Sequence, residues 1–392
     1  MLACAMAGLL AMNVSPCAGA DDRTPGPTTV MFDRTLNAPC ADLVTDDSCR
    51  YTPEGLSVRG PERLVRLNRY YALAQRLVRY HVRFSADAKA VFQGDKGEFQ
   101  AFVDVPNRTI SLATNPEISK SVDFLNPDDE YLVEVHRDYQ QARFRVIDLF
   151  TGESAEICAT NDGQGGYGTG AVASGFAVGR QYDYYCFGLA GGSELLVKQV
   201  CVISPACGLT LLLYGDSITE PEGYFPTSGF PMAWTQQVMG HVPGKAVSSG
   251  RGGTTINELL ARIRNELPYV KAKYVMVTIG TNGGNTEENL GELIEYIRSQ
   301  GAVPILNNIP CNEHGTQIPV NEMIEKVREK YGVKGCRFDL ATSVNHDGQQ
   351  VDETLMWRED YGEGGVYYHH PNAAGATRMY LRTLIDVPEI YQ

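Results

Sequence analysis

The sequence has 392 residues, 43% of them hydrophobic and 21% charged, so it is long enough for two domains and can bury a large core. The formal net charge is −13, and no dense run of Lys and Arg interrupts this acidic balance. A nucleic-acid-binding protein needs a basic stripe to neutralise phosphates, so we expect no nucleic-acid partner.

The first twenty residues carry no charged side chain and predict an export signal. Residues 2–12 form an apolar run of signal-peptide length, and Ala18-Gly19-Ala20 fits a small-x-small cleavage site. A frayed apolar terminus is the alternative. We favour export, to the periplasm, the cell surface or the medium. No later segment has the roughly 18 to 20 apolar residues that span a bilayer, so we expect no membrane span.

The cysteines give no sign of a metal centre. Of ten cysteines, Cys4 and Cys17 fall in the predicted signal, which leaves eight. None of the eight lies in a Cys-x-x-Cys pair or at zinc-binding distance from a histidine, so we expect no metal site and no cofactor. An even number in an exported chain permits disulfides, and buried free thiols are an equally good interpretation.

From about residue 55 to residue 205 the dominant pattern has period two, which indicates half-buried β-strands. Apolar and polar residues alternate over 78–84, and apolar residues recur at the same spacing over 99–105 and 131–135. Turn signals at 106–108 and 161–166 separate such segments.

These strands predict an all-β sandwich domain over residues 21–206, with a Pro- and Asp-rich leading segment over 21–55. The arrangement is similar to jelly-roll domains of the laminin-G or concanavalin type. The polar row Arg79, His81 and Arg83 is a candidate binding face, but the solvated face of a sheet is the more common meaning of such a row.

After Cys207 the pattern becomes that of an α/β domain, which we place at residues 207–392. Nearly unbroken apolar runs predict strands buried on both faces, at 209–214, 273–279 and 303–309. Helical spacing of apolar residues predicts intervening helices, around 256–267, 286–301 and 320–332. Strands that alternate with helices predict an open, mostly parallel sheet between two helix layers, with ligands at the carboxyl ends of the strands.

Four short motifs lie after strand ends or near the end of the chain: Gly215-Asp216-Ser217, Gly253, Gly280-Thr281-Asn282 and His370-Pro371-Asn372. In this order they resemble the SGNH hydrolases, also called GDSL-type esterases. The resemblance implies that Ser217 is a catalytic nucleophile and His370 its base. It also implies an oxyanion hole made by the backbone N–H groups of Ser217 and Gly253 and the side-chain amide of Asn282.

One position departs from the pattern of that family. The family usually has Asp three residues before the catalytic His, and Tyr367 stands there. Three interpretations stay open: a backbone carbonyl orients His370 in a Ser–His dyad, Asp360 or Glu363 folds back to it, or the site is impaired. We favour the dyad. We expect the adjacent His369 to serve packing.

Export and an appended β-sandwich favour a polysaccharide substrate, so the expected activity is hydrolysis of acyl esters, chiefly O-acetyl, on an acylated carbohydrate. Candidate sugar contacts lie in the site-forming loops, at Glu220, Glu222, Tyr224 and Arg251. One alternative is a broad acyl esterase or lipase, with an acyl channel along 224–226 and 230–232. The other is a non-catalytic glycan-binding protein. The oligomeric state is not predicted.

Overall fold

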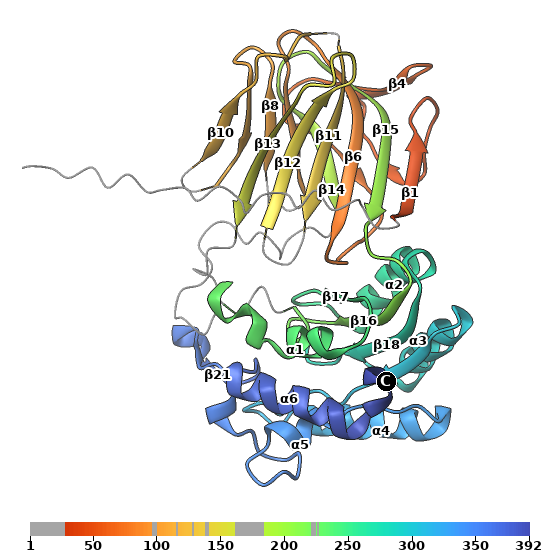
Figure 1. Cartoon of the computed structure of the whole chain (residues 1–392), viewed down its shortest axis with the longest axis vertical. Coiled ribbons are helices and arrows are strands. Elements are labelled where there is room, and N and C mark those ends of the chain that lie inside the picture. Colours follow the sequence, from red (N-terminus) through yellow and green to blue (C-terminus); the bar gives the residue numbers. More distant parts are fainter. Residues whose placement is uncertain are drawn as a thin grey trace, which may run out of the picture.

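The computed structural model describes residues 28–95, 100–114, 117–127, 129–137, 141–160, 184–220, 225 and 227–392. The predicted signal at 1–20 and the predicted turn at 161–166 lie outside the described residues. The described chain forms a β-rich part, drawn at the top of Figure 1, and a part with helices and a parallel sheet below it.

Two antiparallel sheets make up the N-terminal part. Their strands are β1 (Thr29–Thr35), β2 (Leu43–Val44), β3 (Cys49–Thr52), β4 (Gly55–Arg59), β5 (Arg63–Leu67), β6 (Arg76–Phe84), β7 (Lys89–Gly94), β8 (Ala101–Asp104), β9 (Thr109–Leu112), β10 (Ile118–Ser121), β11 (Glu130–Arg137), β12 (Gln141–Asp148), β13 (Ser154–Thr160), β14 (Tyr185–Gly191) and β15 (Glu194–Ser204). One sheet has the order β13-β12-β11-β6-β15-β4-β3, with β1 joined to β15, and the other has the order β10-β9-β8-β7-β14-β5-β2.

The period-two pattern between residues 55 and 205 predicted the all-β character of this part. In β6, buried residues alternate strictly with half-buried ones. Of the half-buried row, Arg79 pairs with Glu134 at 2.6 Å and His81 pairs with Glu130 at 2.6 Å. This row is therefore a ladder of cross-strand ion pairs on a partly exposed sheet face, the more common of its two expected meanings.

The described part of the leading segment, residues 28–55, forms strands. It contributes β1, β2 and β3, and β1 pairs antiparallel with β15 along Thr29–Thr35. β2 and β3 have two and four residues, too few to show alternation, and in β1 the two buried residues, Met31 and Phe32, are adjacent. Their stability comes from the neighbours with which they pair.

The C-terminal part alternates strands with helices. Its elements are β16 (Leu209–Gly215), η3 (Thr227–Met232), α1 (Trp234–His241), β17 (Ala246–Gly250), α2 (Ile256–Val270), β18 (Ala272–Thr278), α3 (Glu287–Ser299), β19 (Val303–Leu306), α4 (Gln317–Tyr331), α5 (Phe338–Thr342), η4 (Glu353–Leu355), β20 (Glu359–Asp360), η5 (Gly362–Gly364), β21 (Val366–Tyr367), α6 (Ala373–Asp386) and η6 (Pro388–Tyr391). Strands β17-β16-β18-β19 form a parallel sheet, and β20 pairs with β21 in a small antiparallel hairpin.

Helices cover both faces of the parallel sheet, and β16 shows why. Leu211 and Leu213 point into one apolar cluster, which includes residues of α1 and α6. Leu212 and Tyr214 point to the opposite face, into the cluster formed with α2, α3 and α4. The predicted three-layer α/β fold behind an all-β part is therefore confirmed.

The second of these clusters continues into the β-sandwich. Tyr71 and Leu73, between β5 and β6, belong to the same apolar cluster as Ile263 and Leu267 of α2. The two parts thus share buried surface, and the boundary at residues 206 and 207 stays a prediction from the sequence.

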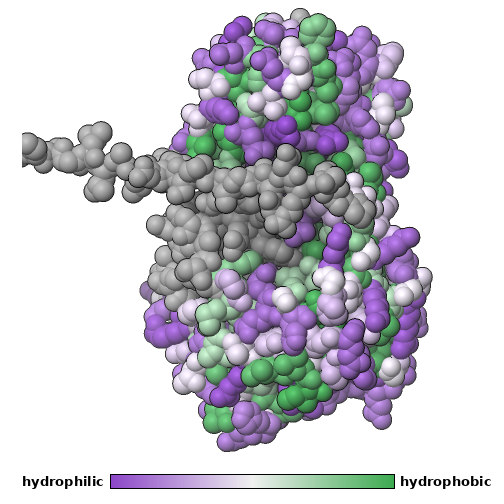
Figure 2. Space-filling view, viewed as in Figure 1, coloured by the Kyte–Doolittle hydropathy of each residue, from purple (hydrophilic) through white to green (hydrophobic). Residues whose placement is uncertain are grey.

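The exterior is largely polar, and several cysteines are buried. Figure 2 shows a mostly hydrophilic face with a hydrophobic patch in the region of α6, where Leu381 and Ile385 are exposed. Cys201, Cys311 and Cys336 are buried free thiols. In the part of the chain that the structure describes, no helix combines the length and apolar character needed to span a membrane.

Candidate active site

The serine lies in a tight turn at the carboxyl end of β16. The Asp216 carboxylate accepts the N–H of Ile218 at 3.0 Å, and the carbonyl oxygen of Ser217 accepts the N–H of Glu220 at 3.2 Å. Gly215 permits the turn, because a Cβ there would lie 2.1 Å from the Thr219 hydroxyl. These contacts leave the N–H of Ser217 without an acceptor among the described residues.

The histidine is held at the start of α6. Asn372 caps this helix by accepting the N–H groups of Ala374 and Gly375 at 2.9 and 3.2 Å. The carbonyl of His370 accepts the N–H of Trp357 at 2.8 Å. The cap and this backbone contact fix the position from which the imidazole reaches Ser217.

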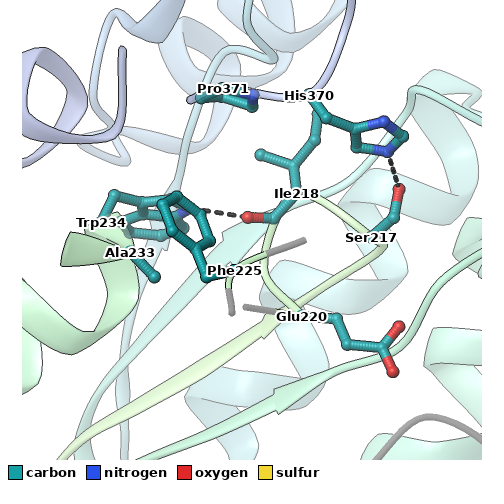
Figure 3. Close-up of a pocket in the computed structure, with 8 residues that line it drawn as sticks. All are labelled: Ser217, Ile218, Glu220, Phe225, Ala233, Trp234, His370 and Pro371. Carbon is teal, nitrogen blue, oxygen red and sulfur yellow. Dashed lines mark hydrogen bonds between the residues drawn. The ribbon is translucent and has the colours of Figure 1, made fainter. Parts of the chain in front are cut away.

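A chain of three buried side chains connects a carboxylate to the serine hydroxyl. His370 Nε2 lies 2.8 Å from Ser217 Oγ (Figure 3). His370 Nδ1 lies 2.8 and 3.0 Å from the two carboxylate oxygens of Glu359. With Nδ1–H donating to Glu359, Nε2 is free to accept the hydroxyl proton, a tautomer assigned from the partners.

Glu359 corrects the expectation for the orienting group. The preferred Ser–His dyad is wrong as a description of the geometry, and so are Asp360 and Glu363 as candidates. Asp360 is exposed and pairs with Arg358 at 2.9 Å, and Glu363 is also exposed.

The small hairpin explains why position 359 supplies the carboxylate. In the β20–β21 pair, Glu359 stands opposite Tyr367, which occupies the position where the family usually has Asp. Opposite residues of an antiparallel pair point to the same face, and adjacent residues point to opposite faces. Glu359 therefore faces His370 while Asp360 faces solvent. The turn residues Gly362 to Gly365 between two short segments were the sequence signal for this hairpin.

His369 is half-buried beside the triad. Its ring centre lies 4.1 Å from that of His370, and its Nε2 lies 3.6 Å from Glu359 Oε2. Burial, and secondarily the neighbouring His370, lower the pKa of His369 to about 4, so this ring is neutral at pH 7.

A metal ion would compete with this arrangement. Among the residues that the structure describes, Glu359, His369 and His370 form the group whose ligand atoms lie close enough to share an ion. Both nitrogens of His370 already have hydrogen-bond partners, Ser217 and Glu359. An ion bound at Nε2 would displace the contact to the serine hydroxyl.

The two other predicted loops approach the serine from β17 and β18. The N–H of Arg251 donates to the carbonyl of Gly215 at 3.1 Å, which ties the loop after β17 to the serine turn. The amide of Asn282 donates to the carbonyl of Thr254 at 3.1 Å, which ties the loop after β18 to the same place. The carboxyl ends of three parallel strands thus bring the predicted motifs together.

Gly253 has the features of a backbone donor. Its φ is +74°, a left-handed conformation that favours glycine, and no heavy atom lies within 4 Å of where a Cβ would project. Its N–H has no acceptor in the described part of the chain. Asn282 is exposed, and its amide nitrogen keeps a second hydrogen for a ligand.

A small cavity adjoins Ser217 and His370. The apolar residues that line it are Ile218, Phe225, Ala233, Trp234 and Pro371 (Figure 3). Trp234 is held in place because its indole N–H donates to the carbonyl of Ile218 at 2.7 Å. The cavity has a volume of about 10 Å³, which is about the space of one water molecule.

The candidate sugar contacts have different outcomes. Glu220 is fully buried; it accepts the N–H of Gly252 and lies 3.9 Å from Arg251, so it holds the loop after β17. Its carboxylate points away from the rings of Phe225 and Trp234 (Figure 3). Glu222 and Tyr224 lie outside the described residues.

Of the expected acyl channel, the described residues place one ring at the cavity. Phe225 lines it, and Phe230 is buried. Met232 is exposed. Residues 224 and 226 lie outside the described part.

Asp216, next to the serine, has a raised pKa. Burial raises the pKa of the Asp216 carboxyl from 3.8 to about 6, although the hydrogen bond from the Ile218 N–H lowers it. Its role in the geometry is to shape the turn, since its carboxylate accepts from the backbone two residues on.

The sequence of residues 213–378 matches the model of the GDSL-like lipase/acylhydrolase family. This part of the chain belongs to the GDSL hydrolases. The predicted resemblance is confirmed, and the activity of the family, acyl hydrolysis, fits the Ser217–His370–Glu359 arrangement.

Solved structures similar to this chain are distant. The acetylxylan esterase Axe2 from Geobacillus stearothermophilus is 20% identical with a TM-score of 0.37, over 47% of this chain and 95% of that chain. A GDSL-like lipase from Bacteroides thetaiotaomicron is 15% identical with a TM-score of 0.34, over 44% and 84%. TesA is 18% identical with a TM-score of 0.37, over 46% and 98%. A comparison with curated proteins finds no match.

Proposed function

We propose that this GDSL hydrolase is a serine esterase that removes short acyl groups, chiefly acetyl, from the hydroxyls of a polysaccharide or oligosaccharide. The proposal of hydrolysis rests on the buried hydrogen-bonded chain from Glu359 through His370 to Ser217, with contacts of 2.8 Å at both ends. The family match supports acyl hydrolysis independently of this geometry.

The proposed reaction has two halves, formation of an acyl-enzyme and its hydrolysis, and the same groups act in both. His370 Nε2 takes the proton of Ser217 Oγ as that oxygen attacks the ester carbonyl, and Glu359 stabilises the imidazolium that forms. The N–H groups of Ser217 and Gly253 and the amide of Asn282 stabilise the negative oxygen of the tetrahedral intermediate. His370 then protonates the leaving alcohol, and a water molecule activated by the same nitrogen hydrolyses the acyl-enzyme.

Cavity size favours a short acyl group. About 10 Å³ beside Ser217 accommodates a group of the size of a water molecule, such as the methyl of an acetyl ester. A long acyl chain needs space that the described walls, including Phe225 and Trp234, occupy. The lipase alternative is therefore the weaker one.

Aromatic rings beside His370 favour a sugar as the alcohol part. Tyr361, on the β20–β21 turn, is 44% exposed, and its ring lies 5.4 Å from that of Tyr367. His314 and His369 each contact Tyr367 edge to face, with ring centres 5.8 Å away. Rings with an apolar face and a polar edge suit the C–H faces and hydroxyls of a sugar.

The non-catalytic alternative loses the observation that supported it. It rested on Tyr367 in the place of the usual Asp, and the carboxylate of Glu359 stands opposite that position. Export remains part of the proposal, supported by the apolar stretch at 2–12, and N-terminal sequencing of the protein recovered from producing cells tests it.

Hydrolysis of p-nitrophenyl acetate and p-nitrophenyl octanoate, beside Ser217→Ala, tests the activity. We expect turnover that falls steeply with chain length and disappears in Ser217→Ala. A folded wild-type protein that hydrolyses neither ester contradicts the proposal.

Acetylated oligosaccharides test the sugar part. Tyr361→Ala is expected to raise KM for an acetylated xylo-oligosaccharide or manno-oligosaccharide and to leave KM for p-nitrophenyl acetate unchanged. Equal kinetics of both proteins on both acetylated oligosaccharides would remove the support that this ring lends to a carbohydrate substrate.

A further inference from the structure

Helix α2 carries two charged residues that are completely buried, Arg262 and Glu266. Both face the segment at residues 70–74, which joins β5 to β6 of the β-sandwich and is itself buried. A buried charge costs folding free energy unless it is hydrogen-bonded, so the partners of these two residues identify what the interface holds in place.

Glu266 fastens the segment from the sandwich to the sheet of the hydrolase. One carboxylate oxygen accepts the N–H groups of Ala72 and Leu73 at 2.7 and 2.8 Å. The other accepts the hydroxyl of Ser249, in β17, at 2.7 Å. The N–H of Ala74 also donates to the carbonyl of Ser248 at 3.0 Å. The sandwich segment is therefore fixed against β17 by directional contacts.

Arg262 connects this interface to the serine turn. Its guanidinium donates to the carbonyl of Gly215 at 3.1 Å and to that of Ser249 at 2.8 Å. The same group donates to the hydroxyl of Tyr70 at 3.2 Å. Gly215 is two residues before the serine, so a contact from the sandwich bears on the backbone that positions Ser217.

Tyr70 also reaches the loop that carries Gly253. Its hydroxyl lies 3.4 Å from Thr254 Oγ1, and the carbonyl of Thr254 accepts the amide of Asn282 at 3.1 Å. Thr254 therefore stands between Tyr70 and two of the proposed oxyanion donors, Gly253 beside it in the chain and Asn282 across the loop.

We propose that Tyr70 of the β-sandwich is a positioning residue for the active site, which acts through Thr254 and Arg262 on the oxyanion loop and the serine turn. The β-sandwich is then a structural component of the catalytic unit. This inference rests on the proposed function, since it assigns Tyr70 a role in positioning the same donors.

Tyr70→Phe tests the inference, because it removes the hydroxyl and keeps the ring. Losing the hydroxyl removes its contact to Thr254 and the hydrogen bond that it accepts from Arg262. The loss is expected to lower kcat for p-nitrophenyl acetate by about threefold to tenfold. KM is expected to stay unchanged, because no contact to the ground-state ester is removed.

Tyr71→Phe is the matched control. Tyr71 is buried in the same segment, and its hydroxyl has no hydrogen-bond partner among the described residues. Removing that hydroxyl is expected to leave kcat within twofold of the wild type. Thr254→Val is expected to lower kcat like Tyr70→Phe. The double variant is expected to show less than the product of the two effects, because the two changes share the loss of the Tyr70–Thr254 contact.

Hydrogen exchange provides a readout that does not need turnover. Amide exchange in peptides that span residues 250–256 is expected to be faster in Tyr70→Phe than in the wild type, and unchanged in Tyr71→Phe. Unchanged exchange in Tyr70→Phe overturns the inference even if the wild type proves inactive. Normal exchange and normal kcat in an active Tyr70→Phe overturn the inference alone and leave the proposed esterase intact.

Discussion

Replacing Glu359 by glutamine removes the negative charge behind His370 and keeps the shape of the side chain. The carboxylate is almost fully buried, and both of its oxygens lie within 3.0 Å of His370 Nδ1. An amide can still accept the Nδ1–H through its oxygen, but it cannot stabilise the imidazolium electrostatically, and its NH₂ group can favour the wrong tautomer.

The contact distance sets the size of the effect. Two unit charges 2.8 Å apart attract each other by about 6 kcal/mol at an effective dielectric constant of about 20. At about 1.4 kcal/mol per tenfold in rate, that is an upper bound of about 10⁴-fold. We therefore expect kcat of Glu359→Gln to fall by about 10³- to 10⁴-fold.

Steady-state hydrolysis of p-nitrophenyl acetate measures this effect. Asp360→Asn is the matched control, because the neighbouring carboxylate faces solvent and pairs with Arg358; it should stay within twofold of the wild type. Unfolding curves of both variants separate a catalytic loss from a folding defect. If folded Glu359→Gln retains more than a tenth of the wild-type kcat, the carboxylate is not the orienting acid and a Ser–His dyad is the better account.

Three further changes probe the turn, the oxyanion loop and the cavity. The pKa of Asp216 is raised from 3.8 to about 6, so the folded state binds this proton more tightly than the unfolded state. The protonated carboxyl therefore stabilises the fold fully below pH 3.8, and that contribution is lost as pH rises through 6. The unfolding free energy of Asp216→Asn is therefore expected to rise by about 3 kcal/mol relative to that of the wild type between pH 3 and pH 7. Urea unfolding at both pH values measures it, and an equal difference between the two proteins at both pH values would exclude the pKa shift. Gly253→Ala forces a Cβ into φ +74°, so we expect a loss of about 1 kcal/mol in unfolding free energy and a lower kcat, and an unchanged kcat would argue against Gly253 as a donor. Phe225→Ala enlarges the cavity and should raise the ratio of p-nitrophenyl butyrate to acetate turnover; an unchanged ratio would mean that the acyl group binds elsewhere.

The predicted motifs converge because their positions depend on local patterns. Buried apolar runs mark β16 and β18, and a parallel sheet brings the carboxyl ends of its strands to one edge. Ser217 and Asn282 follow such ends, and the loop with Gly253 follows β17, so their order along the chain was enough to place them together. His370 was selected by the Pro371-Asn372 that follows it, and Asn372 is the N-cap of α6.

The acid was missed because its position depends on pairing across a turn. Glu359 lies eleven residues before His370, and only the register of β20 against β21 turns it inward while Asp360 points outward. Two residues per strand are too few to show alternation, so the sequence contains no periodic signal that separates position 359 from position 360.

The sequence by itself therefore determined the fold class and the order of the motifs, which follow from neighbours along the chain. The serine and the histidine were assigned through the resemblance of these motifs to the SGNH hydrolases. Only the tertiary structure decided which carboxylate faces the histidine and what the β-sandwich holds. Arg262 and Tyr70 meet although 192 positions separate them in the chain. Contacts at such separations are selected by burial and by the hydrogen bonds that buried charges require, and no local pattern encodes them.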